Sequence, residues 1–167
     1  MNYVFVYGTL MEGYGNNRLL TSGNAELVGK AITQPSFVML ASGLNGIPFV
    51  ADVKEEHKGY PSDYWLRNAT PIHGEVWRCD ADTLRSLDRL EGHPNWYKRE
   101  RVKVDFSNNQ NTAPFEVWIY LMPMSESEFK SVNNYPILVR NGNFRTIRDS
   151  GIARNTFLCL YDKKFDN

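Results

Sequence analysis

Short strand-like segments outnumber helical segments in this chain, and that imbalance limits the fold more than any other feature. Runs that are apolar throughout, or that alternate apolar with polar residues, are typical of strands. They lie at residues 3–7, in two segments of 25–41 that break near Pro35, and at 49–51, 72–79, 101–106, 115–121 and 157–161. The clearest helix is predicted at 80–92, with a single turn at 16–20 and a shorter helix at 125–132. Crossover helices are too few for a doubly wound parallel sheet, so the pattern favours a mixed α+β sheet, curled into a barrel.

Chain length and charge limit the number of domains and the classes of binding partner that we expect. The 167 residues fit a single domain over 1–167, with 42% hydrophobic and 23% charged residues as in an ordinary globular protein. Lys+Arg and Asp+Glu both number 19, so the balance shows no electrostatic footprint for nucleic acid or an anionic membrane. No apolar run approaches the roughly 20 residues of a membrane span. We expect neither partner, and the oligomeric state stays open.

The cysteines and histidines show no metal-ligand spacing. Cys79 and Cys159 lie far apart, and the three histidines, His57, His73 and His93, do not pair with one another or with a cysteine. We therefore expect no metal site. Two reduced thiols in a cytoplasmic protein are the simplest interpretation, and a single long-range disulfide is the alternative. The apolar run at 4–6 is too short for a secretory leader, which agrees with a cytoplasmic location.

A glycine-rich loop follows the first predicted strand, in the stretch VFVYGTLMEGYGNN. A phosphate-binding P-loop needs a Lys-Ser/Thr pair after its last glycine, whereas Asn16 and Asn17 stand there. The glycine spacing also differs from the G-x-G-x-x-G dinucleotide fingerprint, which excludes that class. Two interpretations remain: main-chain N–H groups that form a nest for an anion, or a plain tight turn. The residues alone favour the tight turn.

A glutamate lies in phase with the apolar stripe of the predicted helix. Leu84, Leu87 and Leu90 form the stripe, and Glu91 follows Leu87 by four residues and Leu84 by seven. A carboxylate on a buried face is unusual, and the negative end of the helix dipole also disfavours its charge there. Both effects raise the pKa of the carboxyl group, which suits a residue that accepts and returns a proton near neutral pH.

The alternative for Glu91 is structural. If the last helical turn frays, the carboxylate reaches water, or it pairs with Arg99 or Arg101. The pattern does not decide between a catalytic and a structural role. Nucleophilic catalysis has no support, because the chain holds no G-x-S-x-G elbow and neither cysteine has an activating neighbour in sequence.

Five short motifs together resemble the gamma-glutamylcyclotransferase-like family, which includes gamma-glutamylamine cyclotransferases and plant proteins induced by avirulence signals. The motifs are VFVYGTL at 4–10, GIPF at 46–49, IHGEVW at 72–77, LDRLEG at 87–92 with Tyr97-Lys98-Arg99 after it, and VWIY at 117–120. They follow the family's order as far as about Met122. Beyond it the match is poor, and NGNF at 141–144 is a degraded form of a Gly-Asp-Trp-like element.

The resemblance implies a mixed α/β barrel with a cavity at one end and an acyltransferase or lyase that needs no cofactor. The implied reaction is an internal aminolysis, in which the α-amine of a gamma-glutamyl group attacks its own side-chain carbonyl. The products are 5-oxoproline and a free amine, and Glu91 is the implied proton carrier. The implied substrate contacts are the main-chain N–H groups of Tyr7, Gly8, Thr9 and Leu10 and the hydroxyls of Tyr97 and Tyr120, which would donate hydrogen bonds.

Two other functions stay open at this point. One is a non-catalytic small-molecule binding protein, a sensor or scavenger, on the same fold. The other is a structural or protein-interaction module, which has little support because the chain has no charge run or long apolar run. The amine or peptide released from the gamma-glutamyl group is not identified by the residues.

Overall fold

The computed structural model describes residues 1–41, 46–52, 68–108, 113–123 and 137–148. Two compact units divide the chain: Met1–Gln34 with His73–Met122, and Pro35–Ile72 with Pro123–Asn167. One domain over 1–167 stays a prediction. All seven residues expected at the site belong to the first unit.

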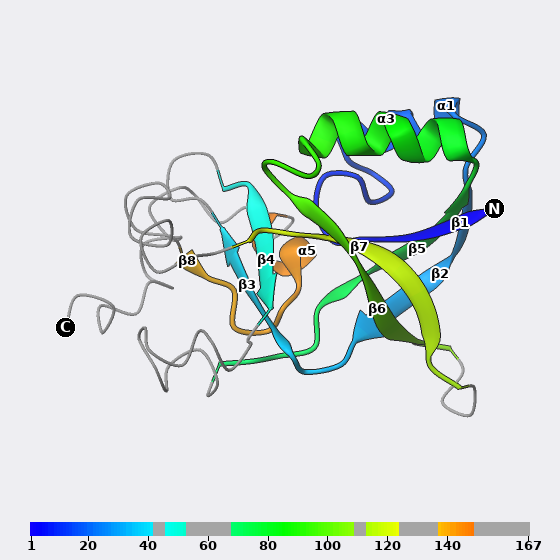
Figure 1. Cartoon of the computed structure of the whole chain (residues 1–167). Coiled ribbons are helices and arrows are strands. Elements are labelled where there is room, and N and C mark those ends of the chain that lie inside the picture. The colour runs from blue at the N-terminus through cyan, green and yellow to red at the C-terminus, as the bar shows by residue number, and fades with distance from the viewer. Residues whose placement is uncertain (42–45, 53–67, 109–112, 124–136, 149–167) are drawn as a thin grey trace. The chain divides into compact units, whose positions relative to one another are not determined.

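The first unit is a closed barrel with the strand order β1-β5-β2-β6-β7 (Figure 1). Its strands are β1 Asn2–Val6, β2 Glu26–Thr33, β5 His73–Cys79, β6 Lys98–Phe106 and β7 Phe115–Leu121. β1 runs antiparallel to β5 but parallel to β7, and this last pairing closes the barrel. The α+β class and the mixed barrel expected from the sequence are therefore confirmed, although β6 begins earlier than the predicted strand at 101–106.

The centre of this barrel is formed by strands with continuous apolar runs. Val4 and Phe5 of β1 have no exposed surface, which agrees with the uninterrupted apolar run in the sequence. β5 can lie this close to β1 because it carries Gly74, where a Cβ atom would stand 2.3 Å from the main-chain oxygen of Val6. β2 has a bulge between Leu27 and Gly29, a common way to bend a barrel strand.

The long helix α3, Ala81–Glu91, has the ends that its sequence predicts. The Asp80 carboxylate accepts a hydrogen bond of 2.7 Å from the Thr83 N–H, which satisfies an unpaired donor of the first turn. Gly92 ends the helix in the left-handed conformation at φ 66°, and the His93 N–H bonds back to the Asp88 carbonyl at 2.9 Å. α3 lies along the barrel beside α1, Arg18–Ser22, which follows the 3-10 turn η1, Gly15–Asn17 (Figure 1).

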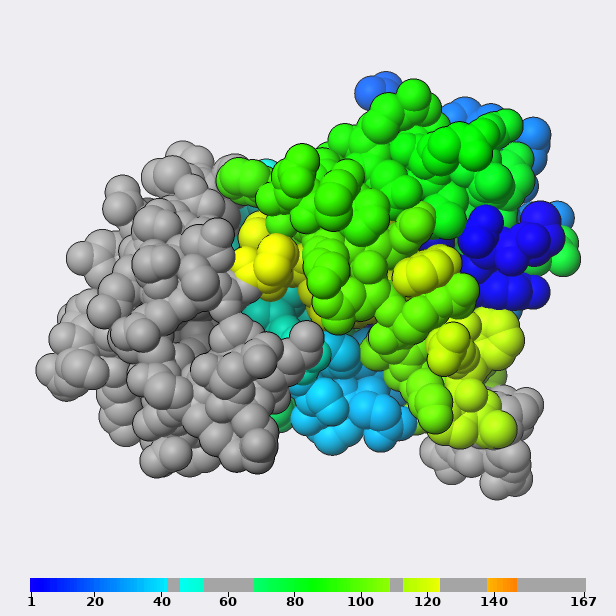
Figure 2. All heavy atoms as spheres, viewed as in Figure 1, coloured from blue at the N-terminus to red at the C-terminus, as the bar shows by residue number. Residues whose placement is uncertain are grey.

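The buried face of α3 differs in one position from the expected stripe. Leu84 and Leu87 are buried, but Leu90 is 46% exposed, so its assignment to the buried stripe was wrong. At 100° per residue, Leu90 is rotated away from Leu84, whereas Asp88 and Glu91 follow Leu84 by four and seven residues and share its face. In the space-filling view the green atoms of α3 and β6 form one continuous surface (Figure 2).

The second unit contains a three-stranded antiparallel sheet with the order β4-β3-β8. Its elements are β3 Phe37–Ala41, β4 Pro48–Asp52, β8 Ile137–Leu138 and the short helix α5 Phe144–Arg148. Every residue of β3 is buried. The predicted break near Pro35 is confirmed, because β2 ends at Thr33 and β3 begins at Phe37, and the strand predicted at 49–51 is β4.

Some sequence predictions lie outside the described residues. These are most of the polar segment at 55–68, most of the turn at 107–112, the helix at 125–132, the strand at 157–161 and Cys159. Cys79 is a buried free thiol, and burial raises its pKa to about 11. Among the described helices, none has the length and apolar character needed to cross a membrane.

Candidate active site

The ends of four elements meet at one end of the barrel. In the register of the hairpin, Lys98 at the start of β6 stands opposite Leu121 at the end of β7. β1 runs parallel to β7, so its carboxyl end, followed by Tyr7, lies at this same end. α3 also ends here, because only a short turn separates Glu91 from β6. The topology thus brings together all of the expected site residues: Tyr7, Gly8, Thr9, Leu10, Glu91, Tyr97 and Tyr120.

The turn after α3 fixes Tyr97 relative to Glu91. The Tyr97 N–H donates a hydrogen bond of 3.1 Å to the Glu91 carbonyl. The N–H groups of Asn95 and Trp96 both bond to the Gly92 carbonyl at 2.9 Å, which winds the intervening residues into a tight loop. Tyr97 is therefore anchored at the position where the buried face of α3 ends.

The Glu91 side chain is partly buried, and burial raises the pKa of its carboxyl group from 4.5 to about 7. Neither arginine that the sequence offers as a partner takes that role here. Arg99 binds Asp88 at 3.0 Å, and Arg101 lies 3.9 Å from Glu116. The raised pKa expected from the helical phase is thus confirmed, with desolvation as its cause. Near neutral pH this carboxyl group exchanges its proton readily.

Tyr97 and Tyr120 are buried near Glu91. Burial raises the pKa of both phenols well above 10, and the negative charge of Glu91 contributes in both cases. For Tyr120 the Asp88 carboxylate raises the pKa further by accepting the phenol hydrogen. Both hydroxyl groups therefore keep their protons throughout the pH range in which Glu91 titrates.

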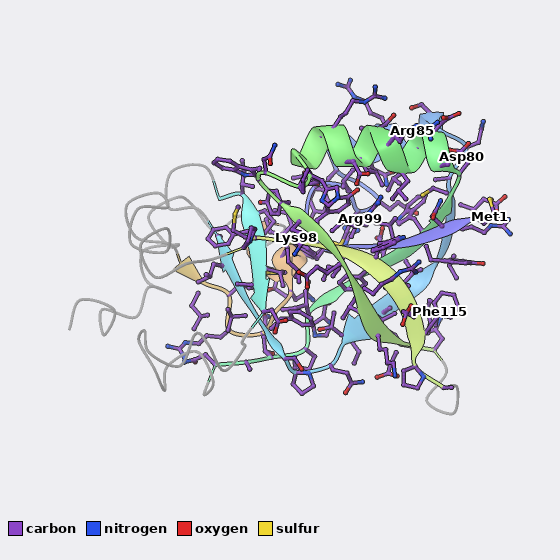
Figure 3. All side chains as sticks on the ribbon, in the orientation of Figure 1. Met1, Asp80, Arg85, Lys98, Arg99 and Phe115 are labelled. Atoms are coloured by element: carbon purple, nitrogen blue, oxygen red, sulfur yellow. The ribbon has the colours of Figure 1, made fainter. Side chains whose placement is uncertain are left out.

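Tyr120 belongs to a cluster that the sequence did not predict. Its hydroxyl donates to Asp88 Oδ1 at 2.7 Å, while Arg99 Nη1 donates to Asp88 Oδ2 at 3.0 Å. The Tyr7 hydroxyl donates to the Tyr120 carbonyl at 2.7 Å, which links β1 to β7. Figure 3 labels Arg99 below α3. The phenol hydrogen of Tyr120 is engaged by Asp88, which leaves its oxygen as a hydrogen-bond acceptor, whereas the sequence predicted a donor.

The loop after β1 turns sharply and leaves amide groups available. The Met11 N–H bonds to the Gly8 carbonyl at 3.0 Å, which closes the turn. Within the described part of the chain, the N–H groups of Gly8, Thr9 and Leu10 donate no hydrogen bond to a protein acceptor. The loop is therefore both a tight turn and a set of three neighbouring donors, so the two interpretations of its sequence are compatible.

Three side chains from two elements, η1 and β5, hold this loop. Asn17, which is buried, donates to the Leu10 carbonyl at 2.8 Å. Asn16 donates to the Thr9 hydroxyl at 2.9 Å. On β5, Glu75 is 3% exposed, and its Oε2 accepts from the Glu12 N–H at 2.9 Å and from Trp77 Nε1 at 3.0 Å. These bonds orient the turn without engaging its three amide donors.

Sequence reasoning missed Asp88, Asn17 and Glu75. Asp88 follows Leu84 by four residues, so the phase argument used for Glu91 also places it on the buried face. Glu75 lies within an apolar strand, a position where an ionisable group is rare without partners. Asn17 has no comparable signal, because asparagine is common in surface turns.

These groups can transfer a proton and bind an anionic oxygen. Glu91 supplies the titrating carboxyl group, and the three loop amides supply donors of the kind found in oxyanion holes. Within the described ranges, no three His, Cys, Asp or Glu side chains come together as metal ligands.

Fold and site together define a small mixed-barrel protein with a carboxyl-centred site. The chain belongs to the family described as gamma-glutamyl cyclotransferase, AIG2-like, whose model matches residues 4–146. Homologues of this chain are named gamma-glutamylcyclotransferases, which are enzymes of the cyclotransferase type, and the family agrees with the resemblance found in the motifs.

Named relatives support the same family. A protein of Methanocaldococcus jannaschii, named as a gamma-glutamylcyclotransferase, is 30% identical over 89% of this chain and 99% of its own. Gamma-glutamylaminecyclotransferase B of Danio rerio is 29% identical over 86% of this chain and 71% of its own. Because these relatives carry enzyme names, the alternative of a non-catalytic binding protein is not favoured.

Solved structures show the same fold. An AIG2-like protein from Mus musculus superposes with a TM-score of 0.61 at 23% identity, over 81% of this chain and 86% of that one. A protein from Pyrococcus horikoshii superposes with a TM-score of 0.57 at 15% identity, over 90% and 95% of the two chains.

Proposed function

We propose that this protein is a gamma-glutamyl cyclotransferase that converts a gamma-glutamyl amine or peptide into 5-oxoproline and a free amine. One observation carries the proposal. Glu91, whose pKa is raised to about 7 by burial, ends its helix at the end of the barrel where the Gly8, Thr9 and Leu10 amides have no protein acceptor among the described residues. The relatives' names supply the chemical class of the substrate.

The reaction begins when the substrate's α-amine attacks the side-chain carbonyl carbon of the same glutamyl group. A C–N bond forms, the carbonyl oxygen takes the negative charge, and the Glu91 carboxylate accepts a proton from the attacking nitrogen. Glu91 then donates this proton to the leaving nitrogen as the original amide bond breaks. The products are the five-membered lactam and a neutral amine, and Glu91 returns to its starting charge.

The loop amides stabilise the charge that forms on oxygen. The Gly8, Thr9 and Leu10 N–H groups would donate to the oxyanion or to the glutamyl carboxylate, with Tyr7 positioned at the start of the loop. One such donor is worth about 3 kcal/mol in known oxyanion holes. No cofactor is required, because nucleophile and carbonyl belong to one molecule and effective molarities of roughly 10⁵ M or more are available to well-oriented intramolecular reactions.

The two tyrosines have different proposed roles. Tyr97, anchored beside Glu91, lines the pocket and donates a hydrogen bond to the substrate. The Tyr120 hydroxyl donates its hydrogen bond to Asp88, so its oxygen can accept one, and an N–H of the substrate's neutral α-amine is the donor that fits.

The test is a panel of gamma-glutamyl amines and peptides, scored for 5-oxoproline by mass spectrometry. We expect turnover of at least one compound and a loss of roughly 10²–10⁴-fold in Glu91→Gln, the usual contribution of general acid–base catalysis. Asp82→Asn is the matched control, because it makes the same chemical change on the exposed first turn of α3 and should keep full activity. Binding without product across the panel, or full activity in Glu91→Gln, would overturn the proposal.

A further inference from the structure

The cluster of Asp88, Arg99 and Tyr120 connects α3 to both strands of the neighbouring hairpin. Arg99 on β6 and Tyr120 on β7 stand directly opposite each other in the strand register. Asp88 gives one carboxylate oxygen to each, at 3.0 Å from Arg99 Nη1 and 2.7 Å from the Tyr120 hydroxyl. The side chains of Asp88 and Arg99 are 21% and 18% exposed, so the pair is only weakly screened by water.

We propose that Asp88 is a positioning residue for Glu91: it fixes the Tyr120 hydroxyl beside the reaction site and holds Arg99 as its own partner, so that Arg99 does not pair with Glu91. This inference rests on the proposed function. The Arg99 guanidinium is largely buried, and a buried cation without a carboxylate partner is strongly destabilising. Asp88 and Glu91 are three residues apart on the same face of α3, so both are candidates for that partner.

The groups that face Glu91 come from several elements. Tyr97 precedes β6 and Tyr120 lies on β7, and the Glu91 charge acts on both phenols. Asp88 and Arg99 act on the same Tyr120 hydroxyl with opposite signs. Asp88 and Arg99 carry opposite charges and bind each other, and burial is the cause of the raised Glu91 pKa.

Arg99 is also held from its other side. Its guanidinium carbon lies 4.6 Å from the centre of the Trp118 ring, and its Nε is buried with no hydrogen-bond partner among the described residues. The main-chain N–H of Arg99 donates to His93 Nδ1 at 3.0 Å. Replacing Asp88 would thus leave a largely buried cation, and Glu91 is the other carboxylate that shares the Asp88 face of α3.

Removing the charge of Asp88 and removing the charge of Arg99 should shift the Glu91 pKa in opposite directions. In Asp88→Asn the uncompensated Arg99 charge should lower the pKa of Glu91 by about one unit or more, since an opposite charge nearby lowers a carboxyl pKa by roughly 1–3 units. In Arg99→Gln the uncompensated Asp88 charge should raise it. The double variant, which has neither charge, should return close to the wild-type value. If Asp88 and Arg99 have only a structural role, both single variants lose activity but the Glu91 pKa does not shift in opposite directions.

The experiment measures the Glu91 titration by carboxyl-carbon NMR and, separately, the pH dependence of kcat/KM for 5-oxoproline formation. Arg101→Gln is the matched control, since Arg101 also stacks on Trp118, at 3.9 Å, but lies beside Glu116 rather than Asp88. Opposite shifts of the Glu91 titration in the two single variants support the inference. An unmoved titration, or shifts in one direction, overturns it. Absence of turnover in the wild type overturns the proposed function instead, because the NMR titration does not depend on activity.

Discussion

Glu91→Gln should stabilise the fold at alkaline pH while it removes activity. In the wild type the Glu91 pKa is about 7 in the folded state against 4.5 for an unperturbed carboxyl group. The folded state therefore binds more protons than the unfolded state between these values, so wild-type stability falls as the pH rises through this window. The full difference of about 2.5 units corresponds to roughly 3 kcal/mol above pH 8. Glutamine has no proton to lose and escapes this penalty.

The assay is urea unfolding of the wild type and Glu91→Gln from pH 4 to pH 8.5. Contributions of all other titrating groups cancel in the difference between the two proteins. The free energy of unfolding of the variant should gain about 2–3 kcal/mol relative to the wild type across this range. A difference that stays constant with pH would show that Glu91 ionises in the folded state as it does in water, and would refute the argument from burial.

Three further variants test the local structure. Asp80→Ala removes the bond to the Thr83 N–H and should lower the free energy of unfolding by about 1 kcal/mol in urea titrations, with KM unchanged. Gly92→Ala places a Cβ at φ 66° and should lower it by roughly 1 kcal/mol or more, measured in the same way; no loss of stability would contradict the left-handed helix end. Asn17→Asp removes the donor to the Leu10 carbonyl and should lower kcat/KM, because the loop amides lose their orientation; unchanged steady-state kinetics would contradict the proposed role of this loop.

Much of the fold is predictable because it depends on local patterns. The alternation in β7 gives a strand with the same bounds in sequence and structure, Phe115–Leu121. Asp80 as the N-terminal cap and Gly92 as the left-handed C-terminal residue also predict the bounds of α3 correctly. The pairing of β1 with β7, which closes the barrel, joins residues more than a hundred positions apart, and no local pattern specifies such a contact.

The site was predictable where it depends on helical phase. Glu91 lies on the buried side of α3 because of its spacing from Leu84 and Leu87. Which carboxylate Arg99 binds was not predictable, because that depends on the β6–β7 register and on where α3 lies against it. The state of the Gly8–Leu10 amides was not predictable either, since glycine permits both a closed turn and an exposed set of donors.

The central claim is that Glu91 transfers the proton in an internal aminolysis, and the pH dependence of kcat/KM for 5-oxoproline formation tests it most directly. The active form is the carboxylate, so the rate should rise with pH along an acid limb centred near the Glu91 pKa of about 7. Glu91→Gln should lose this limb together with roughly 10²–10⁴-fold of the rate. An acid limb that persists unchanged in Glu91→Gln would contradict the assignment of Glu91 as the proton carrier.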